Sequence, residues 1–281
     1  MPAPGPQRNV AKWERFPFDH RAAILAPEMT SSSFFLAPEG RRTRVLDSGV
    51  GHPVVVLHGW GGRIESMTPV LTCLAPAFRI VAIDLPGFGE SVTPPPEWGT
   101  SDYAVHVCEI LDELEVERAH FVGHSFGART SMFIAATEPS YVDRLILQAP
   151  SGLRSPPTMK GRLKKAASKG GRVAGRLGPA GRRLKQSIYQ GVASSDYQEA
   201  GPLRPVLVRV VNEDLSGTLP SVESSTLLIW GSEDDAVPVA HGRRMEELIP
   251  DAGLIIFEGA GHFAYLEEPD RFCRITRHFL D

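Results

Sequence analysis

The 281-residue chain has little cysteine, no long apolar run and almost no net charge, and each shortage excludes a class of protein. Its three cysteines, Cys73, Cys108 and Cys273, lie far apart and match neither a metal-ligand nor a disulfide spacing. We interpret them as buried small hydrophobic residues, which suits a reducing compartment. Met1–Met29 contains no apolar run long enough for a signal-peptide core or a membrane span. We therefore expect a cytoplasmic protein without a membrane span.

The charge of the chain is small overall but unevenly distributed. A formal charge of −3 and an isoelectric point near 6.3 give no basic field for nucleic acid, so we expect a small-molecule substrate instead. The oligomeric state is not predicted. Arg154–Ser195 contains eleven Lys and Arg and no Asp or Glu, which leaves about −14 on the rest of the chain. We favour a solvated outer face for this stretch, with attraction of an anionic substrate or an anionic surface as the alternative.

Short apolar, β-branched runs predict buried strands, because each run is too short for a buried helix. These runs are Val54–Leu57, Phe78–Asp84, His120–His124, Leu145–Gln148, Thr226–Trp230 and Leu254–Phe257. Helical patterns lie between several of them, the clearest after the capping cluster Thr100–Asp102, and Pro269–Leu280 is the last predicted helix. Strands that alternate with helices predict a mostly parallel sheet covered by helices on both faces. Ser33–Leu36 and Thr43–Asp47 predict a hairpin added at the sheet edge.

The alternation of strands and helices is interrupted once. Roughly 70 residues separate two strand-like runs that one helix would otherwise join, which is too long for a simple connection. We predict an inserted helical subdomain at residues 151–224. Residues 1–150 and 225–281 then form the α/β core.

The most specific chemical signal is the G-x-S-x-G motif Gly123–Gly127, which has Ser125 at its centre. It follows a predicted strand and precedes a helical segment, as the motif requires. Small flanking residues allow a turn sharp enough to expose the serine oxygen above the sheet. The following helix directs its N-terminus at the site, so the amide of Phe126 is a candidate oxyanion donor. The motif predicts Ser125 as a nucleophile.

A serine nucleophile needs a base and an acid that orients the base. Of the nine histidines, His262 is the one in a loop after a late strand, and we predict it as the base. His58 and His124 flank the site as structural residues, and the other six, including His52 and His120, are interpreted as surface or packing residues. The acid should come between serine and histidine in the chain, which points to Asp234, with Asp235 as the alternative.

The loop His58–Gly62, after the first long strand, should supply the second oxyanion donor, and we choose the backbone amide of Trp60. The alternative for Trp60 is a ring that lines the pocket. Asp84, in a loop of glycine and proline, is interpreted as a structural residue. No residue pattern predicts a cofactor or a metal.

Five segments in this order and spacing resemble the α/β-hydrolase superfamily over roughly Arg42–Asp281. They are HGWGG, DLPGFGES, GHSFG, WGSEDDAVP and GAGHF. The resemblance implies an eight-stranded, mostly parallel sheet and makes the insertion at 151–224 a cap over the active site. It disfavours haloalkane dehalogenases and epoxide hydrolases, which have Asp where this chain has Ser125.

Within the serine branch, the chain is most similar to carboxylesterases and to hydrolases that cleave carbon–carbon bonds in dienoate products of aromatic ring fission. Two departures weaken the second similarity: Ala128 replaces a frequent second glycine, and HGWGG lacks the usual glycine–proline continuation. We therefore expect hydrolysis of a small or medium carboxylic ester, with carbon–carbon hydrolysis as the alternative. Lyases, perhydrolases and non-catalytic small-molecule receptors of this fold keep the triad as well.

Overall fold

The computed structural model describes residues 33–154 and 200–281. Residues 33–154 and 205–281 belong to one compact unit, whose fold is given below. Most of the predicted cap, and the basic stretch Arg154–Ser195 beyond its first residue, lie outside the described residues.

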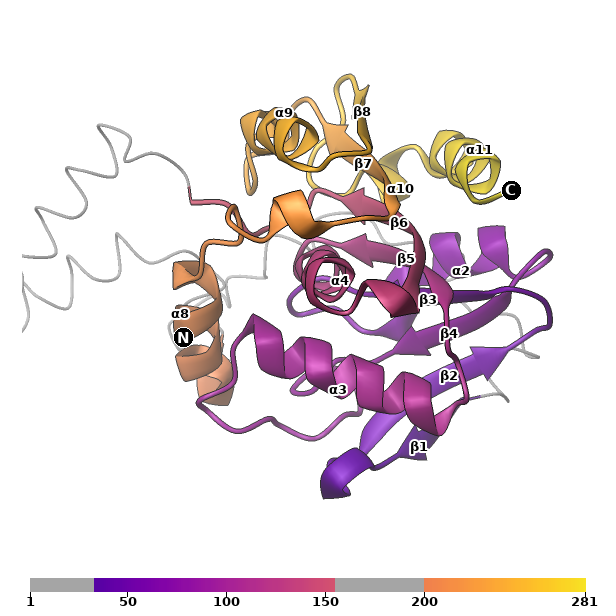
Figure 1. Ribbon diagram of the computed structural model, residues 1–281, viewed down its shortest axis with the longest axis vertical. Coiled ribbons are helices and arrows are strands. Elements are labelled where there is room, and N and C mark those ends of the chain that lie inside the picture. Colours follow the sequence, from indigo (N-terminus) through magenta and orange to yellow (C-terminus); the bar gives the residue numbers. More distant parts are fainter. Residues whose placement is uncertain (1–32, 155–199) are drawn as a thin grey trace, which may run out of the picture. The chain divides into compact units, whose positions relative to one another are not determined.

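An eight-stranded sheet forms the centre of this unit (Figure 1). Its strands are β1 (Ser33–Leu36), β2 (Thr43–Ser48), β3 (Pro53–Leu57), β4 (Arg79–Ile83), β5 (Ala119–His124), β6 (Val142–Gln148), β7 (Ser225–Gly231) and β8 (Ala252–Phe257). In space they follow the order β1-β2-β4-β3-β5-β6-β7-β8. The first two strands are antiparallel to their neighbours and all further pairings are parallel. Every predicted strand and the predicted hairpin are confirmed.

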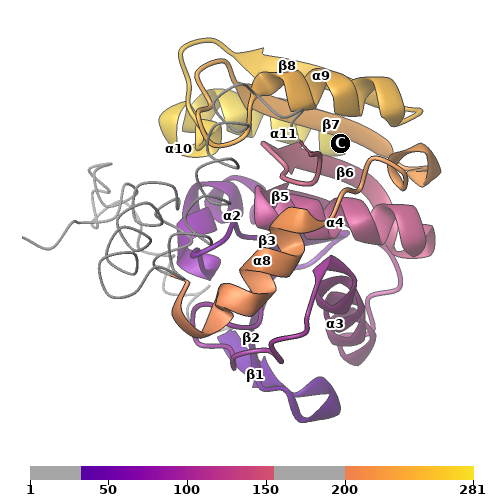
Figure 2. The same cartoon turned by 90° about the vertical axis from the view of Figure 1, so that its left-hand side faces the viewer.

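Helices cover both faces of the sheet, as predicted. Within the described residues the α-helices are α2 (Thr68–Leu74), α3 (Thr100–Glu113), α4 (Phe126–Thr137), α8 (Arg204–Asn212), α9 (Val239–Leu248), α10 (Ala264–Glu267) and α11 (Pro269–Leu280). Short 3₁₀ segments are η2 (Pro38–Gly40), η3 (Ile64–Met67), η4 (Pro139–Tyr141), η5 (Gly201–Leu203) and η6 (Leu219–Ser221). Figures 1 and 2 show α2 and α11 on one face of the sheet, and α3 and α4 on the other.

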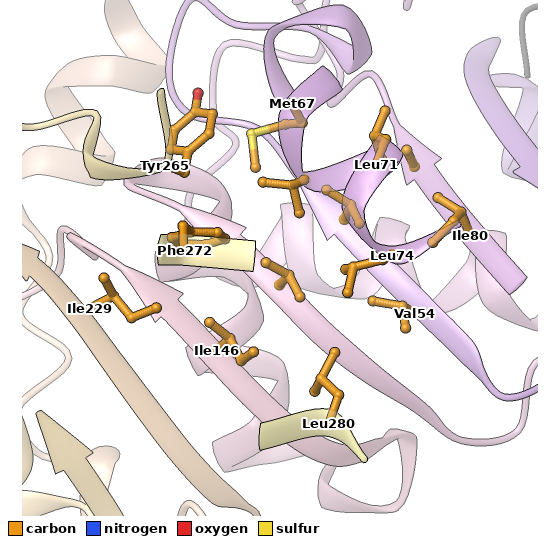
Figure 3. Packing of buried hydrophobic residues seen from close by; sticks show 14 of the residues in the cluster. Val54, Met67, Leu71, Leu74, Ile80, Ile146, Ile229, Tyr265, Phe272 and Leu280 are labelled. Atoms are coloured by element: carbon orange, nitrogen blue, oxygen red, sulfur yellow. The ribbon is translucent and has the colours of Figure 1, made fainter. Parts of the chain in front are cut away.

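The core on the first face joins the sheet to α2 and α11 (Figure 3). Alternate residues of the strands point to this face, such as Val54 and Val56 of β3, because side chains alternate along a strand. They pack against apolar residues of the two helices, including Leu71, Leu74 and Phe272. Each fully buried side chain of this kind contributes about 1.5–3 kcal/mol. The apolar stripes of two helices far apart in sequence are thus held against one sheet.

The parallel strands place the five segments that resemble α/β hydrolases at one edge of the sheet. The loops after β3, β4, β5, β7 and β8 carry HGWGG, DLPGFGES, GHSFG, WGSEDDAVP and GAGHF respectively. Carboxyl ends of parallel strands meet at the same edge, where α/β proteins bind their ligands. The carboxyl edge of the sheet is therefore the candidate location of the active site.

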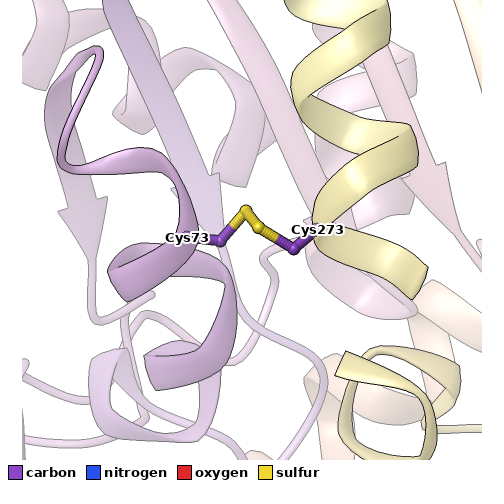
Figure 4. Close-up of a disulfide and its surroundings, with 2 residues drawn as sticks. All are labelled: Cys73 and Cys273. Carbon is purple, nitrogen blue, oxygen red and sulfur yellow. A yellow bond between two sulfur atoms is a disulfide. The ribbon is translucent and has the colours of Figure 1, made fainter. Parts of the chain in front are cut away.

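The interpretation of the cysteines as three separate buried residues is wrong. Cys73 of α2 and Cys273 of α11 form a disulfide across 200 residues of sequence (Figure 4). Only Cys108, buried in α3, is free. Sequence spacing could not reveal the pair, because it forms only when α2 and α11, which lie far apart in the sequence, pack side by side. The bond also removes the cysteine-based argument for a reducing compartment, since such bonds persist in oxidising ones.

The disulfide should contribute to stability. Cys73→Ser should lower the free energy of unfolding by about 2–4 kcal/mol, because the cross-link restricts the unfolded chain. Urea unfolding with and without reductant measures this loss. Reductant should destabilise the wild type by a similar amount and leave Cys73→Ser unchanged. Cys108→Ala, the control, should keep the sensitivity to reductant; equal curves for reduced and oxidised wild type would contradict a stabilising bond.

Candidate active site

Ser125 occupies a strained turn between β5 and α4. Its φ of 49° and ψ of −101° lie in a region that non-glycine residues rarely adopt. Both motif glycines are required by close approach. A Cβ on Gly123 would lie 2.5 Å from the Cα of Ala128, and a Cβ on Gly127 would lie 2.2 Å from the carbonyl oxygen of Leu57. The sequence G-x-S-x-G thus folds into the sharp elbow that its pattern predicts.

Backbone hydrogen bonds hold this elbow in place. The amide of Ser125 donates to the carbonyl oxygen of Gln148 in β6 at 2.9 Å. The carbonyl oxygen of Ser125 accepts from the amide of Arg129 at 2.9 Å, which starts α4. Phe126 is the first residue of α4, so its amide belongs to the first turn, where helices leave N–H groups without intrahelical partners. This is the position expected for an oxyanion donor.

His262 and Asp234 form a hydrogen-bonded pair in the loops after β8 and β7. The Nδ1 of His262 lies 2.8 Å from the Oδ2 of Asp234. The other carboxylate oxygen accepts from the amides of Ala236 and Val237 at 2.9 and 2.8 Å. The Asp234 side chain is fully buried, whereas Asp235 is exposed. Because an ionised carboxylate only accepts, Nδ1 of His262 carries a proton and Nε2 is left as the basic nitrogen.

Two further residues hold the backbone of His262, and sequence reasoning gave neither this role. Nε2 of His124 lies 3.1 Å from the carbonyl oxygen of His262, and the side-chain amide of Gln148 donates to the same oxygen at 3.0 Å. Gln148 also accepts the Ser125 amide through its backbone, so one residue contacts both loops. No local pattern marked Gln148, because its burial and its contact with the His262 loop arise only in the folded chain.

Removal of the Gln148 amide should therefore disturb the position of His262 without unfolding the protein. We expect Gln148→Leu to lower kcat about tenfold and to leave KM nearly unchanged, because the substitution withdraws one of two donors from the His262 carbonyl. Steady-state kinetics with a chromogenic substrate measures both constants. Thr137→Val, at an exposed hydrogen bond of α4, is the control. A rise in KM at constant kcat would contradict a positioning role.

The loop after β3 lies directly beside Ser125. A Cβ on Gly59 would lie 2.6 Å from Nδ1 of His124 and 3.4 Å from Cβ of Ser125. His58 supports this loop: its Nδ1 donates to the carbonyl oxygen of Gly59 at 2.8 Å, and its Nε2 accepts the amide of Leu85 at 3.0 Å. The structure thus gives His58 the structural role that was expected. Trp60 is the residue after Gly59, which is the residue of this loop that packs against Ser125.

Aromatic rings form a cluster at this loop. Trp60 packs edge-on against Phe88 and Phe126, with ring centroids 4.9 and 5.3 Å apart. Phe126 in turn contacts Tyr103 of α3, with centroids 4.9 Å apart. The side chain of Trp60 therefore lies in an aromatic cluster, which leaves its backbone amide as a separate candidate donor.

Asp84 has the structural role expected for it. Its buried carboxylate accepts the amides of Ile64 and Glu90 at 2.7 and 3.0 Å. Arg44 lies 3.5 Å from it and also pairs with Glu65 at 2.8 Å. These contacts join the loops after β3 and β4 to each other.

Buried histidines should make the fold sensitive to acid. Burial lowers the pKa of His58, and it lowers the pKa of His124 well below the ordinary value of 6.5. Below about pH 6.5 the unfolded chain binds protons that the folded chain refuses, so stability falls as pH falls. Each histidine should remove up to about 2 kcal/mol between pH 7 and pH 5. Urea unfolding across this range should show that the free energy of unfolding falls less steeply with decreasing pH in His58→Gln than in the wild type. An equal pH dependence in the two proteins would contradict a lowered pKa of His58.

Comparison with known proteins agrees with this fold. A model of the alpha/beta hydrolase family matches residues 54–275. A 2-hydroxy-6-oxo-2,4-heptadienoate hydrolase of Pseudomonas putida is 28% identical and aligns over 86% of this chain and 93% of its own length. A crystal structure of a hydrolase from Pseudomonas aeruginosa is 26% identical, with a TM-score of 0.67, over 88% and 98% of the two chains. A meta-cleavage product hydrolase of Pseudomonas fluorescens is 25% identical, with the same TM-score, over 88% and 97%.

The serine elbow at the carboxyl edge of a mostly parallel sheet defines the class of hydrolases built on the α/β fold. The chain belongs to the alpha/beta hydrolase family. Among the helices that the structure describes, none has the length and apolar character to cross a membrane.

Proposed function

We propose that the protein hydrolyses a small or medium carboxylic ester through a Ser125–His262–Asp234 triad. The observation that carries the proposal is the strained elbow at Ser125 together with the 2.8 Å pair of His262 and Asp234 at the same sheet edge. A serine hydroxyl needs a neutral imidazole to accept its proton, and the carboxylate fixes the tautomer that can do so.

The reaction proceeds through an acyl-enzyme. Nε2 of His262 takes the proton of Ser125 as its oxygen attacks the ester carbonyl, and Asp234 stabilises the imidazolium. The backbone amides of Trp60 and Phe126 donate to the oxyanion, each contributing on the order of 3 kcal/mol. His262 then protonates the leaving alcohol and activates the water that releases the acid. None of these steps requires a cofactor or a metal.

The aromatic cluster supports an apolar acyl group. Phe88 and Phe126 are 7% and 2% exposed and pack against the half-buried Trp60, so the Trp60 ring is the member of this cluster that offers apolar surface at the proposed oxyanion loop. Such a surface favours hydrocarbon over charged substituents. We further propose that residues 151–224 form a cap.

Carbon–carbon hydrolysis of a dienoate is the second candidate, because several relatives have names that state this activity. The same triad residues would act on a ketone carbonyl. Against it stand Ala128 and the loop HGWGG, which depart from the pattern of those enzymes. Ala128 is fully buried, and its backbone packs closely against Gly123.

One kinetic comparison tests the proposal. Chromogenic p-nitrophenyl esters of graded chain length are assayed beside 2-hydroxy-6-oxo-6-phenylhexa-2,4-dienoate, with kcat/KM as the measure. A higher kcat/KM for an ester supports the proposal, whereas preference for the dienoate overturns it in favour of the second candidate. Turnover of neither substrate, with tight binding of one, would indicate a non-catalytic receptor.

A cytoplasmic location is the last part of the proposal. The Cys73–Cys273 disulfide counts against it. Alkylation of free thiols in intact cells, followed by mass spectrometry, decides: labelled Cys73 and Cys273 support a reducing location, and unlabelled ones oppose it.

A further inference from the structure

Three metal-ligand side chains meet at the edge of the sheet opposite the triad. His52 precedes β3, His120 is the second residue of β5, and Asp143 is the second residue of β6. These three strands are neighbours and parallel, so their amino ends lie together. Ser125 follows the carboxyl end of β5, five residues beyond His120, which separates the two places by roughly 16 Å.

The candidate ligand atoms face one another. Nε2 of His52 and Nδ1 of His120 each lie 3.4 Å from the same oxygen, Oδ2 of Asp143. One ligand atom from each of the three residues lies within 4.8 Å of the others. The rings of the two histidines are 4.3 Å apart between centroids. The other oxygen of Asp143 pairs with Arg118 at 2.9 Å, which orients Oδ2 toward the histidines.

An irregularity in the sheet produces this arrangement. Between the pairs Ala119 with Val142 and Phe121 with Leu145, His120 opposes two residues of β6, Asp143 and Arg144. A bulge of this kind redirects side chains. Here it sets the Asp143 carboxylate beside the His120 ring, while Arg144 donates to the carbonyl oxygen of Phe279.

His120 has a buried ring nitrogen that lacks a hydrogen-bond partner among the described residues. It is only 5% exposed, and its Nδ1 is buried without a hydrogen bond to any described residue. The 3.4 Å separation from Asp143 is long for a hydrogen bond. It does match the edge of a tetrahedron around zinc, since metal–ligand distances of about 2.0–2.1 Å place neighbouring ligand atoms roughly 3.3 Å apart.

We propose that His52, His120 and Asp143 form a binding site for a divalent transition-metal ion, zinc in the first place. Two imidazole nitrogens and one carboxylate oxygen suit zinc, cobalt and nickel better than calcium or magnesium. The side chain of His52 is 40% exposed, so the ion can reach the site from solvent on this side. Water is the fourth ligand of the ion. The ion joins three strands at the edge away from the proposed reaction, so it stabilises the fold and takes no part in the chemical step.

Zinc titration of the full-length protein, followed by isothermal calorimetry and by the thermal unfolding midpoint, tests the site. We expect His52→Gln and Asp143→Asn each to weaken zinc binding at least tenfold and to abolish the rise in midpoint that zinc gives the wild type. His278→Gln, at an exposed histidine of α11, is the matched control and should bind as the wild type does.

Cobalt supplies a second readout, because a tetrahedral site gives intense visible absorption bands, which should disappear in His52→Gln. Absence of zinc binding to the wild type would overturn the proposal. A zinc affinity that falls less than tenfold in both His52→Gln and Asp143→Asn would overturn it as well. This outcome includes the case in which zinc binds His262 and inhibits turnover. Neither variant touches the triad, so loss of the metal site and loss of the proposed esterase activity are distinguishable.

Discussion

Ser125→Ala should reduce ester turnover by at least about a thousandfold and leave the fold intact. In serine hydrolases of this type the nucleophile and base act as a unit, so the loss of either removes nearly all turnover beyond what binding and the oxyanion donors supply. Alanine keeps the Cβ of serine, so the strained backbone at φ 49° meets no new contact. Circular dichroism and the unfolding midpoint should match those of the wild type.

Ser131→Ala is the matched control. Ser131 is fully buried in α4, where its hydroxyl donates to the carbonyl oxygen of Gly127 at 2.9 Å, so this substitution removes a hydroxyl close to the elbow without removing the nucleophile. A fluorophosphonate probe should label the wild type and Ser131→Ala but not Ser125→Ala. If Ser125→Ala retains more than a tenth of wild-type turnover, another residue is the nucleophile.

The sheet and its chemical edge were predictable because they depend on local patterns. Short apolar runs fixed the six parallel strands, and turn residues after each run marked the carboxyl ends where Ser125, Asp234 and His262 lie. The start of β6 was missed, since Asp143 and Arg144 interrupt the apolar run that begins at Val142. Those same polar residues form the bulge beside His120.

Other features depend on contacts between distant segments and left no local pattern. The Cys73–Cys273 disulfide requires α2 and α11 to pack together across most of the chain length. The grouping of His52, His120 and Asp143 requires the strand order β3-β5-β6, which the predicted elements alone did not supply. Gln148 resembles any polar residue at a strand end until the loop of His262 is placed beside it.

Asp234→Asn should lower turnover on the order of 10³ to 10⁴-fold with little change in stability. Oδ1 of Asp234 accepts the amides of Ala236 and Val237, so an asparagine keeps its carbonyl oxygen there and turns its NH₂ toward His262. Nδ1 of His262 must then accept a hydrogen bond, which moves the ring proton to Nε2 and leaves no base for Ser125.

Asp235→Asn is the matched control, because it makes the same chemical change one residue along in the same loop, at an exposed side chain. It should change kcat less than twofold. The two variants are compared by kcat and kcat/KM for one ester at one pH, together with fluorophosphonate labelling of Ser125, which should slow in Asp234→Asn alone. A larger loss in Asp235→Asn would contradict the 2.8 Å pairing of Asp234 with His262 as the functional one. An equal loss in both would mean that the charge of the loop, not the tautomer of His262, governs the reaction.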